Sequence, residues 1–267
     1  MYRVWRECLG ELIGTYILVF IGCAAVGMAA VLGWLSSLWQ VAGIWGIGVT
    51  LAIMASQKLC PAHLNPAVTL AMCLAKGHSW RRLIPYSLAQ LIGASLAALT
   101  LILIFSDAID EGEKRLLGTD SDIYQFVGPL RGIESAQMFG EFFPNPGYDH
   151  LLEINWMQAM GLEALGAFLL VLFILMITDH IHRLDWNIAG QIGLVVALII
   201  CIIAPFTQCG INPARDLGPR LVAYLHGWNE TAFPSPVHSA ITVYVLGPLI
   251  GAFIASIIWR SGRPKMH

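Results

Sequence analysis

Hydrophobic residues run through this chain in long blocks that short polar stretches separate. The block from Leu9 to Leu35 holds one charged residue, Glu11, in 27 residues. An α-helix needs about 20 apolar residues to cross the hydrocarbon core of a bilayer. The pattern therefore predicts membrane-spanning helices. Six segments are long enough: about 9–33, 40–57, 83–105, 156–178, 187–206 and 240–259.

Two further apolar stretches, about 66–76 and 213–225, are too short to span a bilayer. Each begins at an Asn-Pro-Ala triplet, Asn65-Pro66-Ala67 in the first and Asn212-Pro213-Ala214 in the second. Asn is a favoured helix N-cap, and Pro is favoured at the first helical position. We therefore expect two half-helices whose N-termini lie inside the membrane.

The two halves of the chain resemble one another. Glu11 corresponds to Glu163, the first triplet corresponds to the second, and Leu91-Ile92-Gly93-Ala94 corresponds to Leu249-Ile250-Gly251-Ala252. Three spans per copy is an odd number, so the second copy must enter the membrane inverted. The predicted fold is an all-α membrane protein with six transmembrane helices and two half-helices in an inverted repeat. We expect one domain, 1–267, with halves of about 1–115 and 150–267.

Charge supports this picture and orients it. Hydrophobic residues make up 57% of the chain and charged residues 12%, about half the charged share of a soluble domain. One side of the six-span arrangement carries most of the bases: Arg3, Arg6, Lys58, Lys76, Arg81, Arg82, Arg183, Arg260, Arg263 and Lys265. The positive-inside rule predicts that this side, with both termini, is cytoplasmic. The long, acid-rich connection 106–155 is then extracellular, and its turn-forming residues indicate that it folds over the outer mouth.

The half-helices indicate what the membrane centre does. Opposed N-termini would each contribute about half a positive charge and unpaired N–H groups, which repel cations and protons. The amides of Asn65 and Asn212 can donate hydrogen bonds to a passing hydroxyl or water. Irregular residues before the triplets, 61–63 and 208–210, would expose carbonyls, which is tolerated at membrane depth only along a cavity.

Five charged or polar side chains lie near these segments. Arg215 in an apolar region is expected to face a polar cavity as a hydrogen-bond donor, and the alternative is a structural pair with Asp216. Glu11 and Glu163 are expected to accept hydrogen bonds from the loops before the half-helices. We interpret His63 as a loop anchor rather than a metal ligand.

No sequence pattern indicates an enzyme. Nucleophile elbows, phosphate-binding loops, zinc spacings and paired catalytic acids are missing from the sequence. The six cysteines lie mainly in apolar surroundings and do not form a disulfide or metal pattern. We therefore predict no catalytic residue, no cofactor, no metal and no nucleic-acid partner.

Taken together, these features resemble the aquaporin superfamily, and within it the glycerol-facilitator (aquaglyceroporin) branch. The resemblance rests on both triplets, Glu11, Glu163, and the run from Asn212 to Arg220 in which Asp216 precedes a base at Arg220. It implies a homotetramer with one pore per subunit and no cofactor.

The resemblance also implies a four-residue constriction near the outer mouth, at Trp45, Ile200, Cys209 and Arg215. Trp45 and Arg215 match glycerol facilitators, whereas Ile200 and Cys209 stand where those channels have Gly and Phe. Tyr244-Val245 likewise replaces a Pro-Leu pair that is typical of the branch. This filter is similar to that of plant nodulin-type channels.

We therefore expect a passive channel for small uncharged solutes, such as glycerol-type polyols and water. We expect it to be an integral protein of the plasma membrane, in this case the bacterial inner membrane. Undissociated acids such as lactic acid, urea and metalloid hydroxides remain open as cargo. An ion-coupled transporter is the rival class. It would need a coupling site near the midplane, for which Glu11 and Glu163 are the candidates.

Overall fold

The computed structural model describes residues 2–117, 131–179 and 184–262, and within those ranges it is helical with no strand. Six helical segments there are long and apolar enough to cross a membrane. The helices that build them are α1 (Tyr2–Ala30), α2 (Leu38–Ser56), α4 (Leu83–Leu117), α7 (Trp156–Ile177), α8 (Trp186–Thr207) and α11 (Gly247–Ser261), the last preceded by α10 (Ser239–Ile241) and η4 (Thr242–Leu246).

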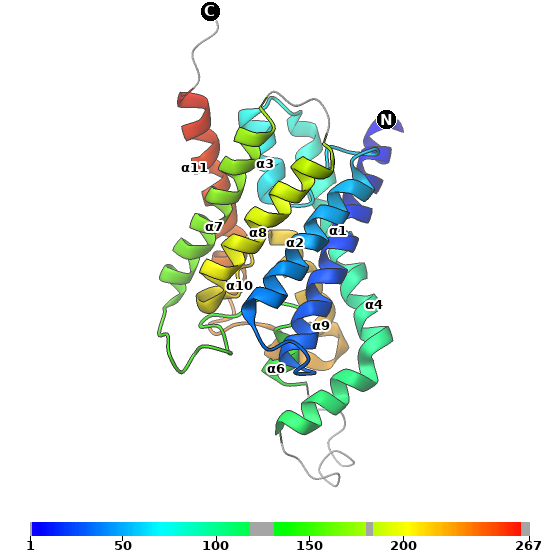
Figure 1. Ribbon diagram of the computed structural model, residues 1–267, viewed down its shortest axis with the longest axis vertical. Helices are drawn as coiled ribbons and strands as arrows, with labels where there is room; N and C mark the ends of the chain where they lie inside the picture. Colours follow the sequence, from blue (N-terminus) through cyan, green and yellow to red (C-terminus); the bar gives the residue numbers. More distant parts are fainter. Residues whose placement is uncertain (1, 118–130, 180–183, 263–267) are drawn as a thin grey trace, which may run out of the picture.

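Two short helices lie inside this bundle and start at the predicted triplets. They are α3 (Pro66–Ala75) and α9 (Pro213–Ala223), and they come from the two ends of the bundle (Figure 1). α3 packs against α11 and α4, and α9 packs against α4. Six spans with two half-helices are the predicted fold class, which the structure confirms.

Equivalent glycines make equivalent close contacts in the two halves. A Cβ at Gly93 on α4 would clash with the carbonyl oxygen of Leu12 on α1. A Cβ at Gly251 on α11 would clash with the carbonyl oxygen of Ala164 on α7. Leu12 and Ala164 directly follow Glu11 and Glu163, so the same helix crossing occurs once in each copy of the repeat.

The start of α1 and the end of α11 lie at the same end of the bundle (Figure 1). There the Arg6 guanidinium donates to the Lys58 carbonyl at 2.7 Å, and Arg82 pairs with Glu7 at 2.7 Å. Lys76 pairs with Asp179 at 2.8 Å at the same end. Arg183, Arg263, Lys265 and the side chain of Arg3 lie outside the described residues.

The third span is longer than predicted. Its apolar signal ends near residue 105, but α4 continues to Leu117, so part of the expected connection 106–155 is helical. The extension is made of good helix formers such as Glu111 and Lys114, and hydropathy does not detect such a polar helix. At its end Arg115 donates to the Val31 carbonyl at 2.8 Å, and Glu113 accepts from the Ser135 N–H at 3.1 Å.

The rest of that connection folds back over the bundle as predicted, within its described part. Its short helix α6 (Ile133–Ala136) packs against α1, α4 and η3 (Asn229–Ala232), and η3 in turn packs against η2 (Tyr224–Trp228). Asn145 donates from its side chain to the Ala204 carbonyl at 2.6 Å and from its backbone to the Phe206 carbonyl at 3.0 Å. The loop is therefore fixed to the end of α8.

The last span is not one regular helix. Thr242–Leu246 is wound as a π-helix before α11 begins. Pro248 explains the change, because a proline ring clashes with the carbonyl four residues earlier and offers no N–H to it. The widened turn contains Tyr244, whose hydroxyl donates to the Thr207 carbonyl at 3.2 Å.

Candidate functional site

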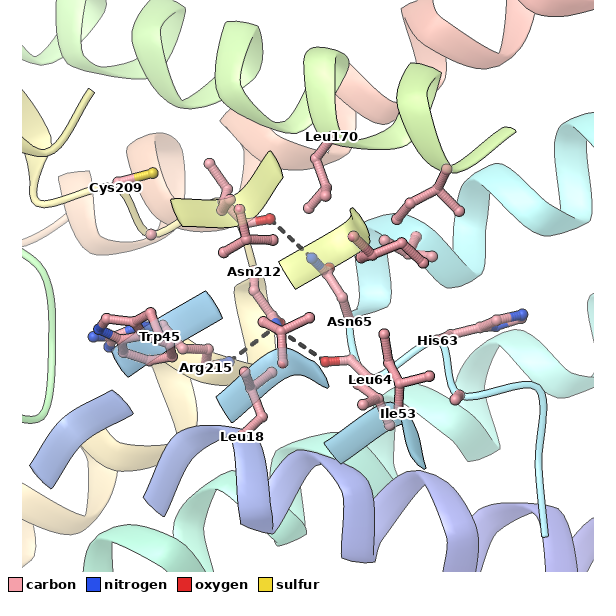
Figure 2. A pocket seen from close by; sticks show the side chains of 18 of the residues that line it. Leu18, Trp45, Ile53, His63, Leu64, Asn65, Leu170, Cys209, Asn212 and Arg215 are labelled. Carbon is pink, nitrogen blue, oxygen red and sulfur yellow. Dashed lines mark hydrogen bonds between the residues drawn. The ribbon is translucent and has the colours of Figure 1, made fainter. Parts of the chain in front are cut away.

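The half-helices meet N-terminus to N-terminus, each capped by its asparagine. The Asn65 side chain accepts from the Ala67 N–H at 2.8 Å. The Asn212 side chain accepts from the N–H groups of Ala214 at 3.1 Å and Arg215 at 3.3 Å. Both caps therefore have their amide nitrogens turned away from their own helices, toward the meeting point (Figure 2).

Each capping asparagine also reaches across to the other repeat. The amide nitrogen of Asn65 donates to the Ile211 carbonyl at 3.0 Å, and that of Asn212 donates to the Leu64 carbonyl at 2.8 Å. An amide nitrogen carries two hydrogens, so each asparagine keeps one for a further acceptor. Two such donors lie together beside two positive helix ends.

The loops before the half-helices have an irregular backbone that two buried glutamates hold. Ala62, Leu64, Gln208, Cys209 and Ile211 have positive φ values between 39° and 68°. Such a backbone turns N–H groups to one side and carbonyls to the other, at a conformational cost that the surroundings must offset.

Each glutamate receives the N–H groups of one of these loops. Glu11 accepts from the N–H groups of His63 at 2.9 Å and Leu64 at 2.7 Å. In the second copy Glu163 accepts from those of Gly210 at 2.9 Å and Ile211 at 2.6 Å. This is the contact expected of both glutamates, and it leaves the loop carbonyls for other partners.

A continuous internal cavity, here called the pore cavity, runs past the two asparagines. The loop segments 61–64 and 208–211 line it, together with Asn65, Asn212 and Arg215. The rest of its wall is mostly apolar: Leu18, Trp45, Val49, Ile53, Val68, Met72, Leu170, Ile174, Leu184, Ile192, Val196 and Ile200. A solute inside would meet a strip of hydrogen-bonding groups along a hydrophobic wall.

The pore cavity meets a hollow at each end of the molecule. At the end with the basic residues it shares Pro61, His63 and Leu184 with an inner hollow. At the other end it shares Trp45, Ile200 and Gln208 with an outer hollow below the folded loop. The three spaces follow one another along the bundle, which is the arrangement that a transmembrane pore requires.

The four residues expected at a constriction all line the pore cavity. Trp45, Ile200, Cys209 and Arg215 are each between 3% and 7% exposed. The Arg215 guanidinium lies over the Trp45 ring, 4.6 Å from its centroid, and Figure 2 shows Cys209 at the same end of the cavity. An aromatic face, an aliphatic side chain, a thiol and a cation therefore come together there.

The ionic partner of Arg215 is a residue that the sequence did not indicate. Arg215 forms an ion pair with Glu141 of the outer loop, and both side chains are 3% exposed. Asp216, the alternative partner, instead pairs with Arg220 at 2.6 Å. Nη1 of Arg215 has no hydrogen-bond acceptor among the described residues and lies beside the cavity.

One feature of the sequence points to Glu141 as a buried acid. It is an acid within Phe139-Gly140-Glu141-Phe142-Phe143, an otherwise apolar run in an acid-rich, polar connection. A carboxylate in such a run is buried only with a partner. Burial raises the pKa of Glu141 to about 8, and the nearby Arg215 guanidinium opposes that rise.

His63 lies beside the inner hollow, on the side away from the asparagines (Figure 2). Its ring packs against those of His78, at 5.0 Å between centroids, and Tyr86, at 5.7 Å. In the described part of the chain no group of three or more His, Cys, Asp or Glu side chains could hold a metal ion.

Comparison with known proteins identifies the family. The family model described as Major intrinsic protein matches residues 1–259. This chain belongs to the major intrinsic protein family. The resemblance to aquaporins and glycerol facilitators is thereby confirmed, and the protein is a membrane channel rather than an enzyme.

Relatives within the major intrinsic proteins include named uptake facilitators. The Glycerol uptake facilitator protein of Escherichia coli (strain K12) is 32% identical over 260 residues, 95% of this chain and 86% of its own. That of Pseudomonas aeruginosa is 33% identical over 257 residues, 95% and 87% of the two chains. The Propanediol uptake facilitator PduF of Citrobacter freundii is 30% identical over 258 residues, 95% and 90% of the two chains.

The fold is shared with a solved structure. The X-ray structure of the aquaglyceroporin from Plasmodium falciparum superposes with a TM-score of 0.76. It covers 97% of this chain and 96% of that one at 21% sequence identity. At this identity the likeness concerns the fold alone.

Proposed function

We propose that the protein is a passive transmembrane channel whose main solutes are glycerol-type polyols. The observation that carries the proposal is the mixed polar and apolar lining of the pore cavity. Polar loop residues from 61–65 and 208–212 line it together with aliphatic residues such as Val49 and Leu170. A polyol has the same two characters, since hydroxyls lie along an apolar carbon chain.

The meeting of the half-helices supports passage of uncharged solutes. Two helix N-termini and the two remaining amide hydrogens of Asn65 and Asn212 make the centre electropositive. A cation or proton would be repelled there, whereas a hydroxyl can accept a hydrogen bond and move on. We assign Asn65 and Asn212, with the rest of both triplets, to this step.

The names of the relatives agree with this solute class. They are described as facilitators of glycerol and of propanediol uptake, and both compounds are small polyols. Trp45 would then provide a wall for the carbon chain and Arg215 a donor for hydroxyls. We assign selectivity to Trp45, Ile200, Cys209 and Arg215, and loop support to Glu11, Glu163, His63 and Asp216.

Undissociated small acids such as lactic acid are a second candidate cargo. Ile200 is an aliphatic side chain at a position where glycerol facilitators have Gly. Together with Cys209 it favours a less polar solute at the constriction. Acid uptake that rises as external pH falls through the pKa of the acid would support this alternative. Glycerol flux in the same vesicles would show which solute class is preferred.

The placement in the membrane follows from the same arrangement. We propose a bacterial inner membrane, with the basic end of the bundle and both termini in the cytoplasm and the folded connection outside. We also propose one channel domain per chain and a homotetramer. Small residues such as Gly43, Gly46 and Gly190 line a groove between α2 and α8. Such a groove suits close contact with a helix of a neighbouring subunit.

Purified protein in proteoliposomes tests the proposed function. Stopped-flow light scattering should show glycerol flux well above that of empty vesicles and proportional to the imposed gradient. Flux no higher than in empty vesicles for glycerol, urea and lactic acid alike would refute a solute channel. Accumulation of solute against its gradient would instead favour the ion-coupled transporter.

A further inference from the structure

Glu141 lies at the boundary between the pore cavity and the outer hollow. It lines both spaces, together with Trp45, Ile200 and Gln208. It is buried and comes from the outer loop, not from either repeat's half-helix. A solute that passes from one space to the other therefore passes this carboxyl group.

The backbone of Glu141 is fixed by the second half-helix. Its N–H donates to Asp216 Oδ1 at 2.8 Å, and its carbonyl accepts from Arg220 Nη2 at 2.6 Å. A Cβ at Gly140 would lie 2.5 Å from Cζ of Arg220, so only glycine lets the loop approach this closely. The Asp216–Arg220 pair thus fixes the backbone of Glu141 at the boundary between the two spaces.

The side chain of Glu141 changes the electrostatics of the constriction. Its Oε1 contacts Nη2 of Arg215, whose guanidinium also lies over the Trp45 ring. When Glu141 is ionised, the two residues carry no net charge. The guanidinium donor, whose Nη1 has no acceptor among the described residues, and the carboxylate acceptor are then in contact through Nη2 and Oε1.

We infer that Glu141 is a fifth selectivity residue, which cancels the charge of Arg215 and gives the constriction an acceptor next to its donor. This inference rests on the proposed function and narrows its substrate class. Each hydroxyl of a polyol both donates and accepts, so adjacent hydroxyls can engage Glu141 and Arg215 together. A carboxylate anion would find the guanidinium already neutralised and would be repelled by Glu141.

The protonation state of Glu141 should therefore control polyol flux. Burial raises its pKa to about 8, opposed mainly by Arg215. The other titratable groups that face it are Asp216 and Arg220 on α9, Glu163 on α7, Cys23 on α1, Cys209 before α9 and Tyr244 on η4. Above about pH 8 the carboxylate is present, and as pH falls through that value protonation removes the charged acceptor.

The test is glycerol flux through the full-length channel in proteoliposomes at about pH 6.5 and about pH 9.5. Glycerol does not titrate in this range, so a pH effect reports the protein. We expect about tenfold higher glycerol flux at the higher pH, because about tenfold is the factor that one charge-assisted hydrogen bond provides. The midpoint of this pH dependence should lie above the usual pKa of histidine. Glu141→Gln should be slow and independent of pH, and its formate flux at the higher pH should exceed that of the unmodified channel.

Two further variants make the result decisive. Glu153→Gln, an exposed acid in the same loop, should behave as the unmodified channel does. Glu141→Asp keeps the carboxylate on a shorter side chain and should keep the pH dependence with a shifted midpoint, and an unshifted midpoint overturns the inference even if Glu141→Gln does not fold. Glycerol flux without pH dependence, or pH dependence that persists in Glu141→Gln, overturns the inference. Absence of glycerol flux at both pH values overturns the proposed function instead.

Discussion

Arg215 is held in the interior by an acid that comes from a distant part of the chain. Arg215 and Glu141 are both 3% exposed, so either one alone would leave an uncompensated buried charge. Breaking a buried ion pair by removing one partner costs about 3–5 kcal/mol. We expect Arg215→Met to lower the unfolding temperature measured in detergent. The double variant Arg215→Met with Glu141→Gln should recover part of that loss, and no recovery would argue against the pair.

Cys209 gives a chemical test of the constriction. It is the one cysteine among the described residues that line the pore cavity, whereas Cys60 lines the inner hollow. A membrane-impermeant mercurial added outside should therefore reduce glycerol flux, because the bound group would narrow the passage. Cys209→Ser should resist this block in light-scattering assays and Cys201→Ser should not. Full inhibition of Cys209→Ser would place the reactive thiol elsewhere.

Individual side chains were predictable to different degrees. Both asparagines and both repeat glutamates could be located, because each stands at a repeated position next to a helix-capping motif. The Glu141–Arg215 pair could not be predicted, because its members lie 74 positions apart (215 minus 141) in segments with no common pattern. Ten acids lie between 106 and 155, and only folding of the loop selects one of them as the partner of the arginine.

At the scale of helices, the glycine contacts hold each repeat together. Gly251 approaches the Ala164 carbonyl so closely that an added methyl would force α11 and α7 apart. Overpacking of this kind costs about 1–3 kcal/mol. Gly251→Ala and Gly93→Ala should each lower the unfolding temperature in detergent. Gly161→Ala on α7, where a Cβ meets open space, should leave it unchanged or raise it.

Element boundaries show where prediction from sequence ends. The half-helices α3 and α9 begin at the predicted positions because Asn and Pro specify a helix start locally. The extension of α4 to Leu117 was missed because its charged residues, such as Glu111 and Lys114, interrupt the apolar block that predicts a span. The π-helical turn at Thr242–Leu246 depends on Pro248 and on packing around Tyr244, which hydropathy does not report.

At the scale of the molecule, three connected spaces cross a bundle whose two ends differ in charge. The inner hollow opens at the end of the bundle where Lys76 and Asp179 line it as an ion pair, and the outer hollow lies under an acid-rich loop. Between them the electropositive meeting point of the half-helices provides the barrier to cations. The whole arrangement needs no moving part to pass a neutral solute, which is why we describe it as a passive channel.

The central claim is that this pore conducts polyols, and one measurement tests it most directly. Vesicles containing the purified protein are mixed with excess glycerol, and the rate of reswelling is followed by stopped-flow light scattering. We predict reswelling much faster than in empty vesicles, linear in the glycerol gradient and without accumulation beyond equilibrium. Reswelling at the rate of empty vesicles, at both about pH 6.5 and about pH 9.5, would contradict the account.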